Sequence, residues 1–277
     1  MQTQPVAPEY VLGRSEMESQ RLIRQSSSMR PSTERVFEKA GINAGMRILD
    51  LGCGVGDVSF LAAELVGPQG SVVGIDVNPG VLAVARRRAH ESGLTRVSFK
   101  ESTIDGFTSA EPFDAVVGRF VLMYQADPVA TLAHVYSLLR TGGLLVLQEP
   151  DFRVGVNTSP PCALWQQVNY WIGETFRRGG VHHDIGGKLY HLFRRAGLPG
   201  PAMLEHVSVG GGATMRPFGE NSVEMIRSLL PTMEQLGIAS AQEVQVDTLT
   251  ERLERDACAT ECQITYVPIV AAWTTKC

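Results

Sequence analysis

The sequence lacks the features that define several large classes of protein. Its 277 residues contain no stretch approaching the roughly 20 consecutive apolar residues of a membrane-spanning helix. Acidic and basic side chains nearly balance, 29 against 25, so the net charge of −4 gives no electrostatic reason to bind nucleic acid or an acidic membrane. The opening residues have neither the basic nor the apolar segment of a secretory signal. We therefore expect a cytoplasmic protein that binds neither membrane nor nucleic acid. We expect it to be a monomer or a homodimer.

Cysteine and histidine are also too few and too scattered to indicate a disulfide framework or a metal site. The five cysteines are odd in number, and Cys258 and Cys262 have no second pair of ligands nearby that would complete a zinc site. His182, His183 and Asp184 are adjacent, and adjacent residues seldom converge on one ion. We expect reduced thiols and no metal.

What is present is the composition of a folded domain, 44% hydrophobic with 28 glycines, divided into three stretches. Residues 1–44 are polar and predict a helical arm from about residue 15 to residue 40, interrupted around residues 26–31. Residues 45–150 predict a core, and residues 151–277 are less regular.

The core alternates between strand-like and helix-like patterns. Strands are predicted at 46–52, 71–77, 96–102, 113–122 and 142–149, with helices at 79–92 and 127–140. Asn78 and Asp127 each precede a proline, which is typical of a helix start. This alternation predicts an α/β fold with a doubly wound, mostly parallel sheet.

The last stretch predicts the rest of the sheet and two helical insertions, at about 152–183 and 212–258, that form a lid over a substrate. Helices are expected at 162–178, 184–197 and 222–257, the last broken at Pro231 and Gly237. Strands are expected near 203–209 and 263–273. Pro268 predicts that the final strand is an edge strand or carries a bulge.

A glycine-rich turn follows the first predicted strand, with the sequence Asp50-Leu51-Gly52-Cys53-Gly54-Val55-Gly56. Ligands of open α/β sheets bind at this carboxyl edge, where glycines let backbone N–H groups approach closely. Asp57 occupies the position of the third glycine of a dinucleotide fingerprint, and Asp50 would repel a pyrophosphate. Asp76 ends the second strand, where a carboxylate can accept hydrogen bonds from a ribose. The pattern therefore favours a cationic nucleoside over a nicotinamide dinucleotide.

Four motifs carry a resemblance to a known family. The segments ILDLGCGVGD, VVGIDVNPGVLAVARRRA, FDAVVGRFVLMY and LLRTGGLLVLQEPD resemble the successive motifs of class I S-adenosylmethionine-dependent methyltransferases, in order and spacing. The resemblance covers about residues 45–150. It implies a Rossmann-like sheet of seven strands, the last antiparallel and inserted between the fifth and sixth, and S-adenosylmethionine as cofactor, with S-adenosylhomocysteine as product.

The resemblance also implies roles for individual residues. Gly52, Cys53 and Gly54 would supply backbone around the methionine part of the cofactor, with Asp50 anchoring the turn and the amino group. Asp76 would bind the ribose. Val77 would pack on the adenine, beside a loop in which this chain has Ser102 where the family usually has an acid. The remaining residues that the resemblance places near the cofactor are Thr103, Ile104, Arg119 and, from the arm, Gln25.

Four side chains are candidates for the chemistry itself. Glu149 ends the fifth strand above the crevice and is a candidate base or an anchor for a loop. His182 and His183 precede a helix and are candidate bases or surface residues, and Tyr124 lines the pocket or packs in the core. A base is optional, because positioning alone can lower the barrier by roughly 7–11 kcal/mol.

The acceptor is expected to be a small molecule. Phe152, Tyr170 and Trp171 near the first insertion favour a largely apolar, aromatic or polyketide-like metabolite of secondary metabolism, methylated on oxygen or nitrogen, with carbon open. Two other hypotheses stay open: an enzyme of the same fold that uses the cofactor for cyclisation or elimination, and a non-catalytic ligand-binding protein.

Overall fold

A seven-stranded sheet forms the centre of the molecule. The computed structural model describes residues 16–277, except for the side chains of residues 16–20, 25, 27, 212 and 213. The strand order is β3-β2-β1-β4-β5-β10-β7, and β10 is antiparallel to both of its neighbours. This confirms the predicted Rossmann-like fold. The bounds are β1 Arg47–Leu51, β2 Ser71–Asp76, β3 Val97–Glu101, β4 Phe113–Arg119, β5 Leu139–Pro150, β7 Ala202–His206 and β10 Ile269–Thr275.

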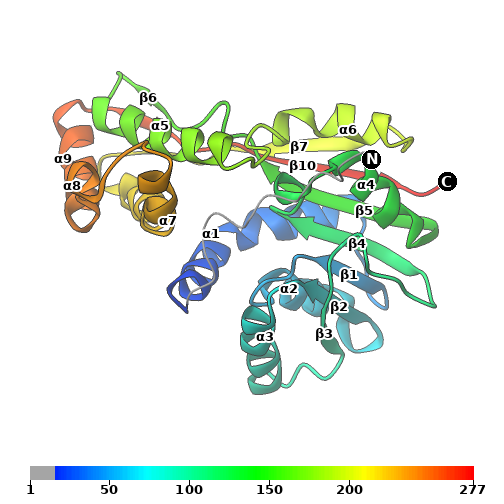
Figure 1. Ribbon diagram of the computed structural model, residues 1–277. Helices are drawn as coiled ribbons and strands as arrows, with labels where there is room; N and C mark the ends of the chain where they lie inside the picture. The colour runs from blue at the N-terminus through cyan, green and yellow to red at the C-terminus, as the bar shows by residue number, and fades with distance from the viewer. Residues whose placement is uncertain (1–15) are drawn as a thin grey trace.

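Helices cover the sheet as the alternating pattern predicts (Figure 1). Asn78 caps α3 by accepting a hydrogen bond from the Gly80 N–H at 2.9 Å. Asp127 caps α4 in the same way, accepting from the N–H groups of Val129 and Ala130 at 3.0 Å. Side-chain oxygens at these positions satisfy amides that have no partner inside the helix. The helices around the sheet are α2 Asp57–Val66, α3 Pro79–Glu91, α4 Pro128–Ser137 and α6 Leu189–Arg195, with short 3₁₀ turns η1 Gly67–Gln69, η2 Leu122–Tyr124 and η3 Gly186–Lys188.

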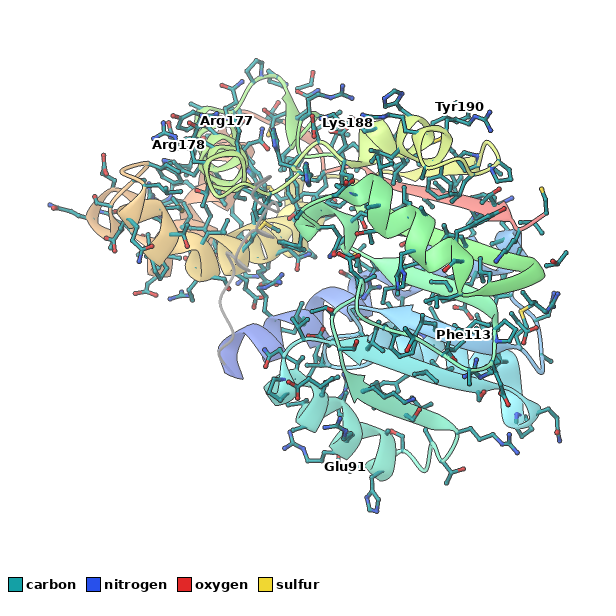
Figure 2. All side chains as sticks on the ribbon, turned by 45° about the vertical axis from the view of Figure 1, so that its right-hand side comes forward. Glu91, Phe113, Arg177, Arg178, Lys188 and Tyr190 are labelled. Atoms are coloured by element: carbon teal, nitrogen blue, oxygen red, sulfur yellow. The ribbon has the colours of Figure 1, made fainter. Side chains whose placement is uncertain are left out.

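The central strands are buried on both faces, as parallel strands covered by helices must be. Leu49 on β1, Val116 on β4 and Val146 on β5 have no exposed surface. Figure 2 shows Phe113 among the strands, while Glu91 at the end of α3 and Tyr190 on α6 point outward. The core therefore supplies a rigid platform whose carboxyl edge holds the loops described below.

The amino-terminal arm is one uninterrupted helix, α1 Glu16–Ala40, so the predicted break at residues 26–31 is wrong. Pro31 lies inside the helix, where it removes one backbone hydrogen bond. Tertiary packing outweighs that loss, because Val36 and Phe37 are buried against the sheet. Ser32 and Thr33 also donate hydrogen bonds to the Met29 carbonyl within the same turn.

A second group of elements, absent from the prediction as a sheet, gathers at the carboxyl edge. It contains a three-stranded antiparallel sheet in the order β6-β9-β8 and the helices that pack on it. Figure 1 shows these elements together at one end of the main sheet. They are β6 Asn157–Ser159, α5 Ala163–Arg178, β8 Val209–Gly211, η4 Gly212–Met215, α7 Arg216–Gln235, α8 Ala241–Val244, η5 Val246–Thr248, α9 Leu249–Ala259 and β9 Gln263–Thr265.

Two prolines act differently from the prediction. Pro231 does not break α7, which continues from Arg216 to Gln235. Pro268 falls between β9 and β10, so the predicted strand at 263–273 is two strands in different sheets. The expectation of an edge strand is wrong, since β10 lies between β5 and β7 and the proline needs to donate no ladder hydrogen bond there.

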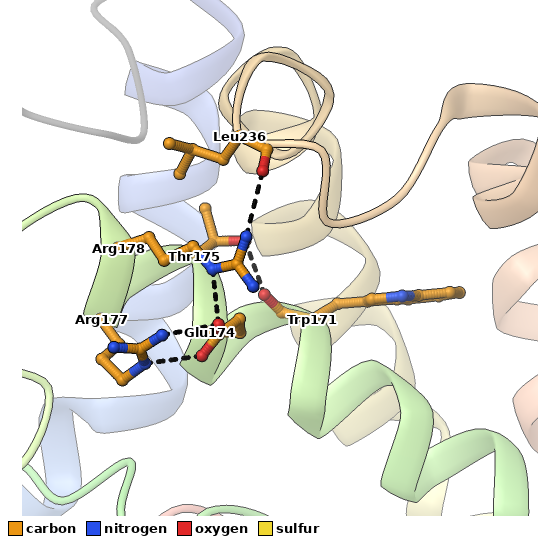
Figure 3. Close-up of polar contacts among 6 residues, drawn as sticks. All are labelled: Trp171, Glu174, Thr175, Arg177, Arg178 and Leu236. Atoms are coloured by element: carbon orange, nitrogen blue, oxygen red, sulfur yellow. Dashed lines mark hydrogen bonds and ion pairs between the residues drawn. The ribbon is translucent and has the colours of Figure 1, made fainter.

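The ends of α5 and α7 are fastened together by the network in Figure 3. Glu174 accepts hydrogen bonds from Arg177 and Arg178, which lower its pKa to about 2. Arg178 also donates to the Leu236 carbonyl just beyond α7, at 3.2 Å. The stripe of α5 that packs inward is buried from Trp165 to Phe176. The elements over the carboxyl edge thus form one packed unit.

No helix among residues 16–277 is long and apolar enough to cross a membrane.

Asp256 on α9 caps α5 from outside, and its removal provides a test of this packing. Its Oδ2 accepts from the Leu164 N–H at 3.1 Å and from the Cys162 thiol at 3.0 Å. We expect Asp256→Ala to lower the free energy of unfolding by about 2 kcal/mol, because both donors lose a charged acceptor. Urea unfolding would measure it. Glu251→Ala, an exposed acid on the same helix, is the control, and an equal loss in both variants would contradict the cap.

Candidate functional site

The turn after β1 is built for close approach by a ligand. Gly54 and Gly56 have φ values of +52° and +94°, in the left-handed region that favours glycine. Between Gly52 and Gly54, Cys53 donates its N–H to the Ile75 carbonyl at 2.9 Å. Burial raises the pKa of the Cys53 thiol, so it is a neutral packing group. Gly52, Cys53 and Gly54 line a cavity.

Asp76 lies at the end of β2, directly opposite this turn. Its Oδ2 accepts from the Gly54 N–H at 3.0 Å and its Oδ1 from the Asn78 N–H at 2.8 Å. A carboxylate offers about four acceptor positions, which suits the two hydroxyl groups of a ribose diol. Asp76 therefore holds the glycine turn in place and presents acceptors to the cavity that it lines.

A slot for a flat ring lies beside Asp76. Val77, with 48% of its surface exposed, and the buried Ile104 both line the cavity, together with Ser102 and Thr103. Sequence reasoning missed Asp105, a carboxylate of the same loop that also lines the cavity. The sequence did contain a signal, because Asp105 is an acidic residue three positions after Ser102, where the family usually has an acid.

Asp50 is not among the residues that line the cavity, and of its two predicted roles the geometry matches the anchor of the turn. It is 1% exposed, and it accepts a hydrogen bond from the Ser59 hydroxyl on α2 at 2.5 Å. Burial raises its pKa to about 7. Asp50 lies on the central strand β1, just before the turn, and its hydrogen bond to Ser59 joins β1 to α2.

Arg119 ends β4 and connects the sheet to the arm. It lines the cavity and donates to the hydroxyl oxygens of Thr33 at 3.2 Å and Ser26 at 3.1 Å, both on α1. Burial lowers its pKa. The side chain of Gln25, the predicted arm residue, lies outside the described residues.

Glu149 supports the loop that follows β4 and does not line the cavity. Its side chain has no exposed surface, and Oε1 accepts from the N–H groups of Val121 at 2.9 Å and Leu122 at 2.8 Å. Burial raises its pKa to about 7. The loop carries backbone strain, since Phe120 has a φ of +60°. Of the two roles that the sequence left open for Glu149, the geometry matches the anchor.

The predicted histidines also serve the framework. His182 makes a hydrogen bond from Nε2 to the Gln125 carbonyl at 3.0 Å, and the carbonyl of His183 accepts from the Phe152 N–H. Neither histidine is among the residues that line the cavity. Tyr124, in the loop after β4, does line it.

The cavity has a volume of about 780 Å³ and extends from the glycine turn to the elements over the sheet. Its far half, the aromatic chamber, is lined by Phe152, Phe176, Phe218, Met225 and Tyr266. Phe218 stacks on Tyr266 with ring centres 5.3 Å apart, and Phe152 packs on Phe176 at 4.9 Å. Tyr170 and Trp171, predicted to join them, are instead respectively exposed and buried in the core. One space therefore joins a nucleoside-shaped end to an aromatic end.

The family model described as "Methyltransferase domain" matches residues 42–197, more than half of the chain. With the sheet order and the glycine turn, this decides the family. The chain belongs to the family of class I S-adenosylmethionine-dependent methyltransferases.

The relatives with known names match this chain over only part of their own length. The aklanonic acid methyltransferase of Streptomyces sp. strain C5 is 39% identical over 127 residues, 45% of this chain and 57% of that protein. The ubiquinone biosynthesis O-methyltransferase of Ruegeria pomeroyi is 39% identical over 171 residues, 60% of this chain and 62% of that protein. The chain therefore matches less than two thirds of the length of these relatives. The YcgJ protein of Bacillus subtilis has a similar fold, with a TM-score of 0.58 at 15% identity, covering 89% of this chain and 98% of that one.

The residues present fit the family's cofactor, S-adenosylmethionine. Asp76 offers acceptors for a ribose, the exposed Val77 offers an apolar surface for an adenine, and the glycine turn leaves room for the methionine end. A pyrophosphate fits less well, because Asp57 occupies the first turn of α2. Asp57 is paired with Arg88 at 2.7 Å. The carboxylates of Asp57 and Asp76 would face a bound nucleoside cation.

Asp76→Ala provides a test of the ribose site. Charge-assisted hydrogen bonds contribute roughly 1.5–3 kcal/mol each, so we expect the affinity for S-adenosylhomocysteine to fall about 10- to 100-fold. Calorimetry would measure it. Glu101→Ala is a matched control. Glu101 lies opposite Asp76 in the register of β2 and β3, and it does not line the cavity. Unchanged affinity in a folded Asp76→Ala protein would contradict the assignment.

Glu149→Gln tests the buried carboxyl through the pH dependence of stability. A pKa raised from 4.5 to about 7 on folding gives the native state stability that is present below pH 4.5 and lost as the pH rises through 7. Glutamine does not titrate. The free energy of unfolding of the variant, relative to that of the wild type, should therefore rise by up to about 3 kcal/mol between pH 5 and pH 8. Denaturant unfolding at both pH values would measure the gain. A difference that is independent of pH would show that Glu149 titrates normally.

Proposed function

We propose that this methyltransferase transfers a methyl group from S-adenosylmethionine to an oxygen atom of a small, largely apolar molecule. The single cavity carries the proposal, because it joins the glycine turn and Asp76 to the aromatic chamber without an intervening wall of side chains. Both named relatives support a small-molecule acceptor, and one is named an O-methyltransferase.

Bound S-adenosylmethionine would supply a sulfonium methyl group, which a nucleophile attacks in line with the sulfur that leaves as S-adenosylhomocysteine. The chain contributes position. Asp76 and the glycine turn would hold the nucleoside and methionine parts, with Val77, Ile104 and Asp105 around the adenine. The loop after β4 is held rigid by Glu149 and would set the distance between the methyl group and the acceptor. Correct positioning supplies roughly 7–11 kcal/mol of the barrier reduction.

Tyr124 would orient the acceptor. Of the four side chains that the sequence suggested for the chemistry, it alone lines the cavity, and it stands on the loop whose backbone Glu149 holds. The aromatic chamber excludes water and receives the apolar body of the acceptor. The strained Phe120 lies between Arg119 and this loop and also lines the cavity.

The test of the function is a product assay resolved by mass. Purified protein should bind S-adenosylmethionine and S-adenosylhomocysteine and should not bind NAD or NADP. In a panel of phenols, carboxylic acids and amines, turnover should release S-adenosylhomocysteine and a product heavier by one methyl group. A product of unchanged mass would indicate cyclisation, and binding without any turnover would indicate a binding protein.

Tyr124→Phe tests the orienting hydroxyl. Loss of one neutral hydrogen bond corresponds to a decrease of about 3- to 10-fold in kcat/KM for the acceptor, with the affinity for S-adenosylhomocysteine unchanged. Tyr170→Phe is the control, since Tyr170 is 52% exposed and does not line the cavity. Equal activity of Tyr124→Phe and the wild type would leave the hydroxyl without a role.

A further inference from the structure

Gln125 follows η2 in the loop after β4 and, like Tyr124 before it, lines the cavity. Its backbone is bonded on both sides. The Gln125 N–H donates to the Leu122 carbonyl at 3.0 Å, and the Gln125 carbonyl accepts from His182 Nε2 at 3.0 Å. Glu149 anchors the same loop. The side chain of Gln125 therefore starts from a fixed point on the wall of the cavity.

The side-chain amide of Gln125 is held in one orientation by the Val121 carbonyl. The distance from Nε2 to that carbonyl oxygen is 3.1 Å, and a carbonyl can only accept, so the NH₂ group must face it. The other amide atom, Oε1, can only accept, and none of the described residues donates to it. Unlike Oε1 of Gln148 and Oε2 of Glu149, it is not a fully buried atom without a partner. Oε1 therefore keeps surface that a ligand group in the cavity can reach.

Backbone hydrogen bonds connect this loop to one ring pair of the aromatic chamber. The His182 N–H donates to the Met123 carbonyl at 2.9 Å, and the carbonyl of the next residue accepts from the Phe152 N–H at 2.8 Å. Phe152 in turn packs on Phe176, and both rings line the cavity. The fixed oxygen of Gln125 therefore belongs to the part of the wall where the cofactor end meets the aromatic chamber.

We propose that Gln125 determines specificity, and that its Oε1 accepts a hydrogen bond from a hydroxyl or amino group of the methyl acceptor other than the group that is methylated. The inference rests on the proposed methyl transfer and specifies its acceptor class. An oxygen that can only accept selects for a donor, because an apolar substituent there leaves the oxygen without a partner. The methylated hydroxyl is a poor donor for this role, since it must lose its proton. The acceptor therefore carries a second, neutral donor group.

The test uses three matched pairs of probes in which a methyl group of similar size replaces one hydroxyl. The pairs are catechol with 2-methylphenol, resorcinol with 3-methylphenol and hydroquinone with 4-methylphenol, so the second group takes each position on the ring. Calorimetry on protein saturated with S-adenosylhomocysteine gives the affinity of each diol relative to its partner. In at least one pair, Gln125→Met should lower this ratio roughly 3- to 10-fold, the effect of one neutral hydrogen bond. Gln125→Glu keeps an acceptor and should not lower it.

Asn221→Leu is the matched control, because Asn221 is a second amide of the cavity lining, on α7, and this variant should keep the wild-type ratio. The proposal is overturned if Gln125→Met leaves the ratio unchanged in all three pairs, if Asn221→Leu or Gln125→Glu lowers it equally, or if the wild type binds none of the probes. It is also overturned if Gln125→Met weakens S-adenosylhomocysteine, since Gln125 would then serve the cofactor. Failure of the wild type to bind S-adenosylhomocysteine would remove the proposed function as well, whereas the other outcomes leave that function standing.

Discussion

Backbone amides at the carboxyl edge of the sheet must find acceptors, and carboxylates at strand ends provide them. The chain turns away from parallel strands at this edge, so N–H groups of the loops have no partner in the ladder. Asp76 accepts from Gly54 and Asn78, and Glu149 accepts from Val121 and Leu122. Two loops that line the cavity are therefore held by carboxyl groups at the ends of β2 and β5 of one rigid sheet, and the rest of the site is arranged around them.

The burial of each carboxyl group separates those that support the site from those that face the cavity. Glu149 and Asp50 are buried, and burial raises the pKa of each to about 7, which suits neutral or weakly charged anchors. Asp76 reaches the cavity and meets ligand as well as backbone. Arg119 extends the support to α1 through Ser26 and Thr33, and Arg24 extends it to α7. The arm lies along the cavity because it is bonded to both the sheet and α7.

Much of the fold was predictable, and the failures have physical causes. The alternation of strands and helices, the glycine turn and the acid after β2 are local patterns, and they were predicted at nearly their observed positions. The predicted breaks at residues 26–31 and at Pro231 were wrong because burial of one helix face outweighs one missing hydrogen bond. The sheet β6-β9-β8 was missed because its strands of three residues come from distant segments.

The sequence by itself determined the family, the sheet and the cofactor end of the cavity, since each depends on residues within one turn of a strand end. Only the tertiary structure decided which carboxylates reach the cavity, because Glu149 and Asp76 both end strands and differ in what covers them. It also decided the aromatic chamber, whose rings come from α5, α7 and the segments after β5 and β9. No local pattern encodes that chamber, because its rings come from four segments spread along the chain from Phe152 to Tyr266.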